Sequence, residues 1–341
     1  MKIAVDCRYL GLSGIGRFLE SILDYFDFSS QEFVLIGKEK LIKKYSPAKY
    51  IIDDNSPFSI KGLFKINKKE INKCDVFFTP NFIIPYGIKI RVVSMLHDII
   101  FMDHKEWNKN FIDTFEKKFL LKKGLKKSDT VFSVSNFSKS RIEHFFPKYF
   151  NKVTFSYPGV SEKFFNKFNN ELKENYIIYV GNVKRSKGLH TLVKAFDILA
   201  DSNLKLYIVG DYSNFRNKDK ELDKYFENKN IVFTGKISDD ELIEKVQKAK
   251  FLIQPSFYEG FGSTPLEAIY LGTKPIISDI DVFKEVYKDL PVSFFKVGDS
   301  IDLADKIKNT DPTFTCDLDK INLKYSYKLY SNIIFKALTK R

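Results

Sequence analysis

The chain has few cysteines and no long apolar run. Its 341 residues include only three cysteines, Cys7, Cys74 and Cys316, which lie far apart and form no Cys-x-x-Cys pair. This spacing argues against a disulfide framework or a zinc ribbon, and it fits a reducing compartment. No apolar stretch approaches the roughly 20 residues that span a bilayer, and Met1 to Asp6 has no signal-peptide pattern. We therefore expect a cytoplasmic protein that is at most peripheral on the inner face of the cytoplasmic membrane.

Acidic residues are scarcer than basic ones, 43 against 56, which gives a formal net charge of +13. The chain is 44% hydrophobic and 16% aromatic, and its charges are spread along its length, which excludes disorder, collagen-like repetition and a coiled coil. The densest basic stretch is Lys117 to Lys127, where apolar residues lie between the lysines. On a helix it would form a basic amphipathic surface for an anionic membrane or another polyanion, although a solvated lysine face is an equal alternative.

Strand-like and helix-like segments alternate along the chain, which predicts parallel sheets covered by helices. A chain of this length is too long for one ordinary core, so we expect two domains. A turn at Pro158-Gly159 and the polar run after it indicate the boundary. We predict an N-terminal domain over residues 1–170, a second domain over 171–320, and a C-terminal helix over 321–341 that crosses back to the first domain.

Each predicted domain is a doubly wound α/β unit, and ligands bind such sheets at the carboxyl ends of the strands. We expect the two domains to face a central cleft at those ends. The main predicted strands are residues 2–6, 33–37, 76–79, 91–96, 130–134, 176–180, 205–209, 231–233, 251–254 and 274–278. The main predicted helices are residues 17–26, 106–127, 138–146, 189–199, 218–227, 239–247, a helix from Pro265, and 318–339.

The segment from Pro255 to Ala268 is the most informative part of the sequence. It follows a predicted buried strand and opens a helix, with Pro265 in the first turn and a capping-box pattern at Thr264 and Glu267. Its glycines allow a ligand to approach the backbone closely, and the free amides of a helix start favour an anion such as a diphosphate. Two carboxylates, Glu259 and Glu267, at the same helix start indicate a binding site rather than a cap alone.

These two glutamates, eight residues apart within the EGFG and PLEA sequences, resemble the E-x7-E motif of family 4 glycosyltransferases. These are retaining enzymes of GT-B fold. Weaker signatures follow in the family's order along nearly the whole chain. They are the SGIGR segment at residues 13–17, His97-Asp98, Ser135, Pro158-Gly159-Val160, and Gly181 through Lys187-Gly188. The combination of SGIGR with His97-Asp98 leans toward mannosyltransferase-like members. A GxGxxG motif is not complete in the first turn, because Leu19 stands where the third glycine would be, which disfavours a dehydrogenase.

The resemblance implies a role for each matching residue. Glu259 would contact the donor hexose, Glu267 the ribose, and Lys187 the diphosphate, while His97 would lie near the donor sugar. Many members of the family have an arginine at the position of Asn182. In this chain the second cation would therefore be either Arg185 or Lys184. The predicted catalytic residues are His97 and Glu259. The predicted donor-binding residues are Gly14, Gly16, Arg185, Lys187, Gly260, Phe261, Gly262, Ser263, Thr264 and Glu267, with Gly235, Lys236 and Ile237 as candidates for the nucleotide base.

The sequence thus predicts a retaining glycosyltransferase that moves a hexose, with mannose from GDP-mannose favoured, onto a glycan or lipid-linked acceptor in bacterial-type surface polysaccharide assembly. No cofactor and no metal are expected, because no DxD motif or histidine cluster accompanies the other motifs, and no nucleic-acid partner is expected. Two alternatives remain open, a GT-B sugar-nucleotide epimerase and a non-catalytic module that binds a nucleotide sugar or a membrane surface.

Overall fold

The structure of the chain divides into two compact units. It is a computed structural model that describes residues 1–169, 173–211, 225 and 227–340. Unit 1 combines Met1–Gly159 with Lys324–Arg341, and unit 2 is Val160–Leu323. The end of the chain therefore returns to the first unit. The predicted boundary between residues 170 and 171 lies outside the described residues.

Unit 1 is built on a seven-stranded parallel sheet in the order β3-β2-β1-β4-β5-β6-β7. The order reverses direction between β1 and β4, as in a doubly wound fold. The strands are β1 (Lys2–Asp6), β2 (Glu32–Gly37), β3 (Lys49–Ile52), β4 (Val76–Thr79), β5 (Arg91–Leu96), β6 (Thr130–Ser133) and β7 (Val153–Phe155). The helices are α1 (Ser13–Leu23), α2 (Glu39–Ile42), α3 (Ile60–Phe64), α4 (Lys68–Ile71), α5 (Ile100–Asp103), α6 (Phe111–Lys127), α7 (Asn136–Phe145) and α14 (Tyr327–Thr339), with short 3₁₀ helices η1 (Cys7–Tyr9), η2 (Lys105–Trp107) and η3 (Pro147–Lys152).

Helices cover both faces of this sheet because successive strand residues point to opposite sides. Val34 lies in a core with Ile71 of α4, and Val131 lies in a core with Leu121 of α6. The neighbour of Val34 in β2 is Phe33, whose ring contacts Phe335 of α14 at a centroid distance of 6.4 Å. The C-terminal helix thus completes the second apolar face of unit 1.

Unit 2 contains a six-stranded parallel sheet in the order β10-β9-β8-β11-β12-β13. Its core joins one face of the strands to α8 and α12, while α9 and α10 contact the other face. The strands are β8 (Glu174–Val180), β9 (Lys205–Val209), β10 (Ile231–Gly235), β11 (Ala249–Gln254), β12 (Pro275–Ser278) and β13 (Ser293–Phe295). The helices are α8 (Leu189–Leu199), α9 (Asp239–Lys248), α10 (Thr264–Tyr270), α11 (Asp281–Tyr287), α12 (Ser300–Asn309) and α13 (Leu318–Asn322), with 3₁₀ helices η4 (Glu162–Phe164) and η5 (Arg185–Lys187).

The prediction of two doubly wound parallel sheets is confirmed, but several element boundaries were wrong. The helix predicted over 17–26 begins earlier and ends earlier, since α1 spans Ser13–Leu23. The predicted helix over 106–127 is divided into η2 and α6, and the predicted helix over 318–339 is divided into α13 and α14. The predicted helix near 218–227 lies almost entirely outside the described residues. The strands and helices that the sequence did not predict, β3, β7, β13, α11 and α12 among them, include both edge strands of the unit 1 sheet and one edge strand of the unit 2 sheet.

Among the described residues, no helix combines the length and the apolar character that crossing a membrane requires.

Candidate active site

The carboxylate of Glu259 is the centre of a polar cluster in unit 2. Glu259 is only 9% exposed and lies in the loop between β11 and α10. Its Oε1 accepts a hydrogen bond from the Ser256 hydroxyl at 2.7 Å, and the Gln254 amide lies 3.5 Å from the same oxygen. The Lys187 ammonium donates to both carboxylate oxygens, at 2.6 and 2.7 Å. The cluster fixes the orientation of this carboxylate through three neighbours.

Lys187 reaches Glu259 because two loops are tied together by their backbones. The amide of Phe257 donates to the carbonyl of Ser186 at 2.9 Å. Gly188, with φ +64°, ends η5, and a methyl group at its Cα would overlap the carbonyl oxygen of Pro255. Only glycine permits this approach, which brings together residues 72 positions apart in the chain. The predicted partnership of these loops in one site is therefore present in the structure.

Glu267 lies in the first turn of α10, but the predicted capping box is wrong. The residue before the helix is Ser263, not Thr264, and it already has helical angles of φ −72° and ψ −25° with no side-chain cap hydrogen bond. Instead, its hydroxyl donates to the Glu267 carboxylate at 3.0 Å. The small cavity beside Glu267 and Thr264, about 10 Å³, has room for no more than about one water molecule. This cavity is therefore too small for a nucleotide.

The loop between the two glutamates is shaped by packing. Gly262 has φ +76°, and a methyl group there would contact the ring of Phe283. The Tyr287 hydroxyl donates to the Gly262 carbonyl. Phe261, predicted to bind the donor, is 5% exposed and belongs to the core. The loop thus holds Glu259 and Glu267 at the carboxyl side of β11, where ligands bind in sheets of this kind.

The other unit 2 residues that were predicted to bind the diphosphate or the base differ in their exposure and in their hydrogen bonds. Lys184 and Arg185 are exposed. Gly235 has φ +70°, and its carbonyl already accepts hydrogen bonds from the Gly210 amide and the Thr234 hydroxyl, both at 3.0 Å. The exposed ammonium of Lys236 lies 3.7 Å from the Asp211 carboxylate. Backbone recognition of a base at residues 235–237 would therefore use groups other than the Gly235 carbonyl.

His97 lies in unit 1, directly after β5. Its Nε2–H donates to the carbonyl of Pro80 at 2.9 Å, and its ring meets the ring of Phe18 edge to face at 4.8 Å. Burial lowers the pKa of His97, although the carbonyl of Pro80 and the Asp98 carboxylate oppose this effect. The lowered pKa favours the neutral imidazole, in which Nδ1 is the acceptor nitrogen when Nε2 carries the proton.

The two predicted glycines of unit 1 differ in their surroundings. A methyl group at Gly16 would overlap the carbonyl oxygen of Tyr9, so this glycine lets α1 lie against η1. A methyl group at Gly14 would have no atom within 4 Å, so the surface at this glycine is open to a ligand. Gly16 therefore has a packing role, and only Gly14 keeps the character of a ligand contact.

Sequence reasoning missed the residues that support Glu259. Gln254 and Ser256 are both buried, and a single glutamine and a single serine gave no signal of their own in the sequence. Their position at the end of a predicted buried strand was the available clue, since carboxyl ends of parallel strands carry functional groups. Among the described residues, no three histidine, cysteine or acidic side chains are grouped as metal ligands would be.

Comparison with known proteins agrees with the fold and with the motifs. The structure of Anabaena Alr3699/HepE in complex with UDP and glucose is similar over 100% of both chains, with a TM-score of 0.74 at 16% identity. The apo form of the lipopolysaccharide outer core galactosyltransferase WaaB is similar over 99% of this chain and 100% of that one, with a TM-score of 0.65 at 18% identity. The chain has the GT-B fold of glycosyltransferases.

The sequence comparisons each cover a part of the chain. Residues 160–310 match the family described as glycosyl transferases group 1. The O-antigen chain mannosyltransferase RfbU of Salmonella typhimurium is 32% identical over 179 residues, which cover 52% of this chain and 50% of that protein. The O-antigen chain mannosyltransferase B of Escherichia coli is 25% identical over 63% of this chain and 59% of that protein. The chain thus spans about half the length of the curated relatives it matches, and the resemblance to mannosyltransferase-like members of family 4 is confirmed.

Proposed function

We propose that the protein is a retaining glycosyltransferase that moves a hexose from a nucleotide diphosphate sugar to a glycan or lipid-linked acceptor in surface polysaccharide assembly. The observation that carries this proposal is the contact between Lys187 and Glu259, with Ser256 behind the carboxylate and Glu267 at the start of the adjacent helix. A cation for a diphosphate and a carboxylate for sugar hydroxyls lie side by side, which is the pair of functions that a sugar nucleotide requires at its scissile bond.

In this proposal each group has a defined task. Glu259 accepts hydrogen bonds from hexose hydroxyls, and Glu267 accepts them from the ribose. The bond between the anomeric carbon and the phosphate oxygen breaks while a bond to the acceptor oxygen forms on the same face. The acceptor proton passes to an oxygen of the departing diphosphate. Lys187 stabilises the negative charge that develops on that group, with an exposed cation such as Arg185 or Lys184 as its partner.

Relatives named as O-antigen mannosyltransferases support mannose as the transferred sugar and GDP-mannose as the donor. A thermal-shift panel of GDP, UDP and dTDP with their sugars tests this choice. We expect the largest rise in melting temperature with the guanine nucleotide, and Glu267→Gln should reduce that rise. A larger rise with UDP or dTDP would overturn the choice of donor, and no response to any nucleotide would overturn the function.

We also propose that transfer needs no metal, because fixed cations take the place of a metal on the diphosphate. Activity should therefore persist within about twofold in excess EDTA. The measurement is the initial transfer rate before and after chelation, with a metal-dependent transferase as the control for effective chelation. Loss of activity that manganese or magnesium restores would contradict this prediction.

The predicted acceptor is a glycan or a lipid-linked sugar, and for the lipid-linked case we propose that exposed lysines of α6 hold the enzyme at an anionic membrane. The six lysines from Lys117 to Lys127 do not form one surface, however. Lys118, Lys122 and Lys126 are exposed at spacings of four residues. The other three are engaged: Lys117 pairs with Asp113 at 2.7 Å, Lys123 lies over the ring of Tyr86, and Lys127 donates to the carbonyl of Ile90. The surface is a stripe of three lysines.

A further inference from the structure

The first half of α6 exposes large apolar side chains that the unit does not use for packing. Phe111 is 82% exposed, Ile112 73%, Phe115 62% and Phe119 52%. The buried residues of this helix are Leu121, Gly124 and Leu125, all in its second half. We call the four exposed side chains the apolar face of α6. Concentrated exposure of this kind marks a surface that binds something apolar.

The apolar face continues directly into the lysine stripe. Phe111, Phe115 and Phe119 are followed by Lys122 and Lys126 at spacings of three or four residues, which places them along one side of the helix. Lys118 lies beside this line, and the only acidic residues of α6 are Asp113, which is paired with Lys117, and the exposed Glu116. An apolar end followed by a basic end fits a bilayer with anionic headgroups better than it fits another protein.

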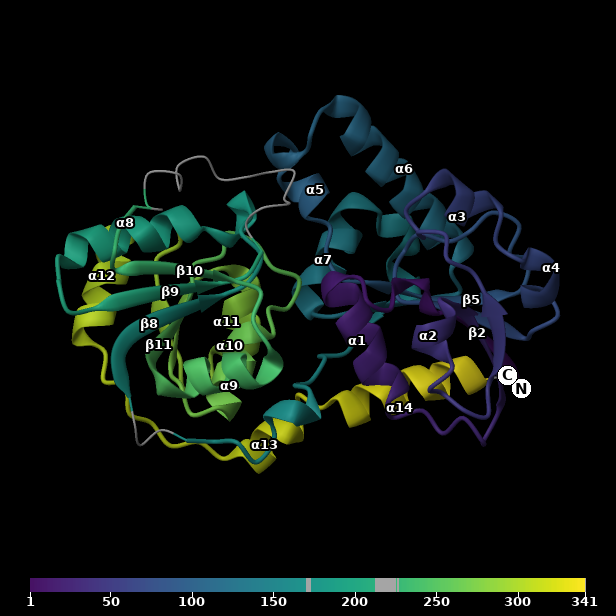
Figure 1. The fold of residues 1–341 in the computed structure, drawn as a ribbon. Coiled ribbons are helices and arrows are strands. Elements are labelled where there is room, and N and C mark those ends of the chain that lie inside the picture. The colour runs from purple at the N-terminus through teal and green to yellow at the C-terminus, as the bar shows by residue number, and fades with distance from the viewer. Residues whose placement is uncertain (170–172, 212–224, 226, 341) are drawn as a thin grey trace. The chain divides into compact units, whose positions relative to one another are not determined.

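The position of the apolar face within unit 1 is equally informative. The segment that contains α6 connects the carboxyl end of β5 to the amino end of β6, and the two strands are parallel. The first turn of α6 therefore lies toward the carboxyl edge of the sheet, where His97 follows β5. The second half of α6 packs on the loop after β4, because Gly124 leaves no room for a side chain beside the carbonyl of Phe82. That packing joins the second half of the helix to unit 1 (Figure 1).

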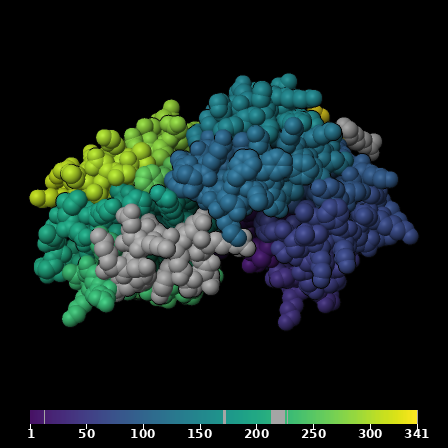
Figure 2. Space-filling model, turned by 90° about the horizontal axis from the view of Figure 1, so that it is seen from above, coloured from purple at the N-terminus to yellow at the C-terminus, as the bar shows by residue number. Residues whose placement is uncertain are grey.

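The short helix α3 also exposes apolar side chains, and it contacts the same tyrosine as α6. Phe64 of α3, which is 50% exposed, stacks on Tyr86 at a centroid distance of 4.3 Å, and Tyr86 also lies under the Lys123 ammonium of α6. The exposed Ile60 of α3 adds to the apolar surface on this part of the unit. Figure 2 looks down on unit 1 from the side on which the segment near residue 110 lies at the surface.

We propose that the apolar face of α6 inserts into an anionic lipid bilayer, with Lys118, Lys122 and Lys126 contacting the headgroups. The inference rests on the proposed transfer to a lipid-linked acceptor and adds the inserting residues to it. Insertion at this edge of unit 1 keeps the carboxyl ends of its strands close to the membrane surface, where the phosphate and first sugar of a lipid-linked acceptor lie. Lysines alone give binding that salt abolishes, whereas inserted phenylalanines give a part of the binding that salt does not remove.

The chain provides its own reporter for this insertion. Its single tryptophan is Trp107, in η2 four residues before Phe111. We expect its fluorescence to shift to shorter wavelength when the full-length protein meets vesicles that contain phosphatidylglycerol, and to be quenched by brominated lipid. Vesicles of phosphatidylcholine alone should bind much less. Vesicle binding without any change in Trp107 emission would overturn the proposal, because the segment would then remain in water.

Three variants separate insertion from electrostatic adsorption and from the proposed function. Phe111→Ser with Ile112→Ser and Phe115→Ser should bind at low salt but lose vesicle binding about tenfold or more at about 0.5 M salt. Lys118→Gln with Lys122→Gln and Lys126→Gln should lose mainly the low-salt part. Ile301→Ser with Leu323→Ser, two residues of unit 2 that are 71% and 80% exposed, is the matched control and should bind as the wild type does.

All three variants should keep the wild-type transfer rate onto a soluble, lipid-free acceptor, so that failure of insertion and failure of the glycosyltransferase proposal are distinguishable. Equal salt-resistant binding by the serine variant and the wild type would overturn insertion. Concentration-dependent dimerisation that the serine substitutions abolish would assign the apolar face to a second copy of the chain, and would also overturn it.

Discussion

At the residue scale, the pairing of Lys187 with Glu259 has a consequence for donor binding. In the structure, the cation proposed for the diphosphate and the carboxylate proposed for the hexose bind each other at 2.6 and 2.7 Å. A donor must therefore replace this ion pair with contacts to itself. Glu259 is already buried and both side chains are already oriented, which lowers the reorganisation that binding requires.

The first prediction separates the two glutamates by their effects on nucleotide and on transfer. Glu259→Gln removes the charge that holds Lys187, so the free nucleoside diphosphate should bind more tightly while transfer slows by about 10- to 100-fold. Glu267→Gln should weaken binding of both the nucleotide and the sugar nucleotide. Calorimetric titration and initial rates measure these effects, with Glu244→Gln on the exposed side of α9 as the control. Weaker nucleotide binding by Glu259→Gln would contradict the proposal that Lys187 leaves Glu259 to bind the diphosphate.

The second prediction concerns pH and His97. Burial lowers the pKa of His97 in the folded protein below its unfolded value of about 6.5. Below that pH the unfolded chain binds more protons at this site than the folded one, so this residue makes the free energy of unfolding fall as the pH falls. His97→Gln should reduce the difference in urea midpoint between pH 7 and pH 5, whereas His144→Gln, at an exposed position, should leave it unchanged. An unaltered pH dependence in His97→Gln would be inconsistent with burial of the imidazole.

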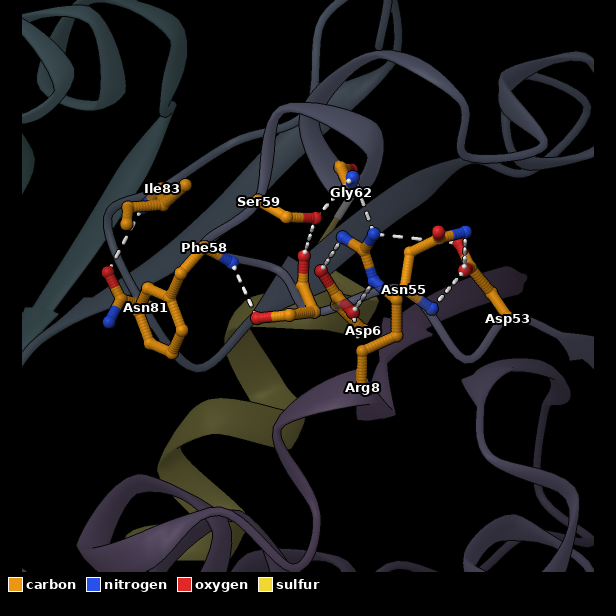
Figure 3. A network of polar contacts seen from close by, with 10 residues as sticks. Asp6, Arg8, Asp53, Asn55, Phe58, Ser59, Gly62, Asn81 and Ile83 are labelled. Carbon is orange, nitrogen blue, oxygen red and sulfur yellow. Dashed lines mark hydrogen bonds and ion pairs between the residues drawn. The ribbon is translucent and has the colours of Figure 1, made fainter. Parts of the chain in front are cut away.

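At the scale of elements, a buried polar network joins η1 to α3 (Figure 3). The side chain of Arg8 is 2% exposed, and it donates to both oxygens of Asp6 at 2.8 and 2.7 Å and to the carbonyl of Gly62 at 2.8 Å. Asp53 lies 3.5 Å from the guanidinium and accepts hydrogen bonds from Asn55. One arginine thus fixes the end of β1, the loop after β3 and the helix α3.

The third prediction follows from this network. Arg8→Met should lower the free energy of unfolding by about 3 to 5 kcal/mol, because Asp6 and Asp53 would remain buried without a counter-charge. Adding Asp53→Asn should restore part of the loss. Equilibrium urea unfolding measures both, and Lys38→Met on the surface of the same unit is the control. A loss no greater than that of the control would mean that the guanidinium does not balance the two carboxylates.

At the scale of the whole molecule, the end of the chain completes a unit that begins at the other terminus. Ser331 of α14 donates to the carbonyl of Ile22 in α1 at 2.9 Å, and Arg91 at the start of β5 donates to the carbonyl of Ala337 at 3.0 Å. Phe335 covers Phe33 of β2. Unit 1 therefore cannot bury its second face until the last residues of the chain are available.

The fourth prediction tests this dependence. A chain that ends at Leu323 should lose protection from hydrogen exchange in β1, β2 and α1, while β8, β11 and β12 of unit 2 keep theirs, because only unit 1 loses its covering helix. Removal of Lys340 and Arg341 alone is the matched control and should have no effect. Equal loss of protection in both units, or none in either, would argue against the assignment of α14 to unit 1.

The sequence by itself determined the alternation of strands and helices, the two-unit plan and the place of Glu259 and Glu267. These features are local: a buried strand is a short apolar run, and a motif nine residues long needs no distant partner. Edge strands such as β3 and β13 escaped prediction because they are short and only partly buried. The helix start at Thr264 was misjudged because the choice between Ser263 and Thr264 depends on backbone angles that residue preferences leave open.

Only the tertiary structure decided which distant residues meet. The pairing of Lys187 with Glu259 depends on two loops 72 residues apart, and the burial of Arg8 depends on contacts with Asp53 and Gly62. The same holds for the lysines of α6, where Lys123 is covered by Tyr86 while Lys122 stays exposed. Sequence spacing gives the face of a helix on which a residue lies, but whether that face meets protein or solvent is fixed by the chain segments that fold against it.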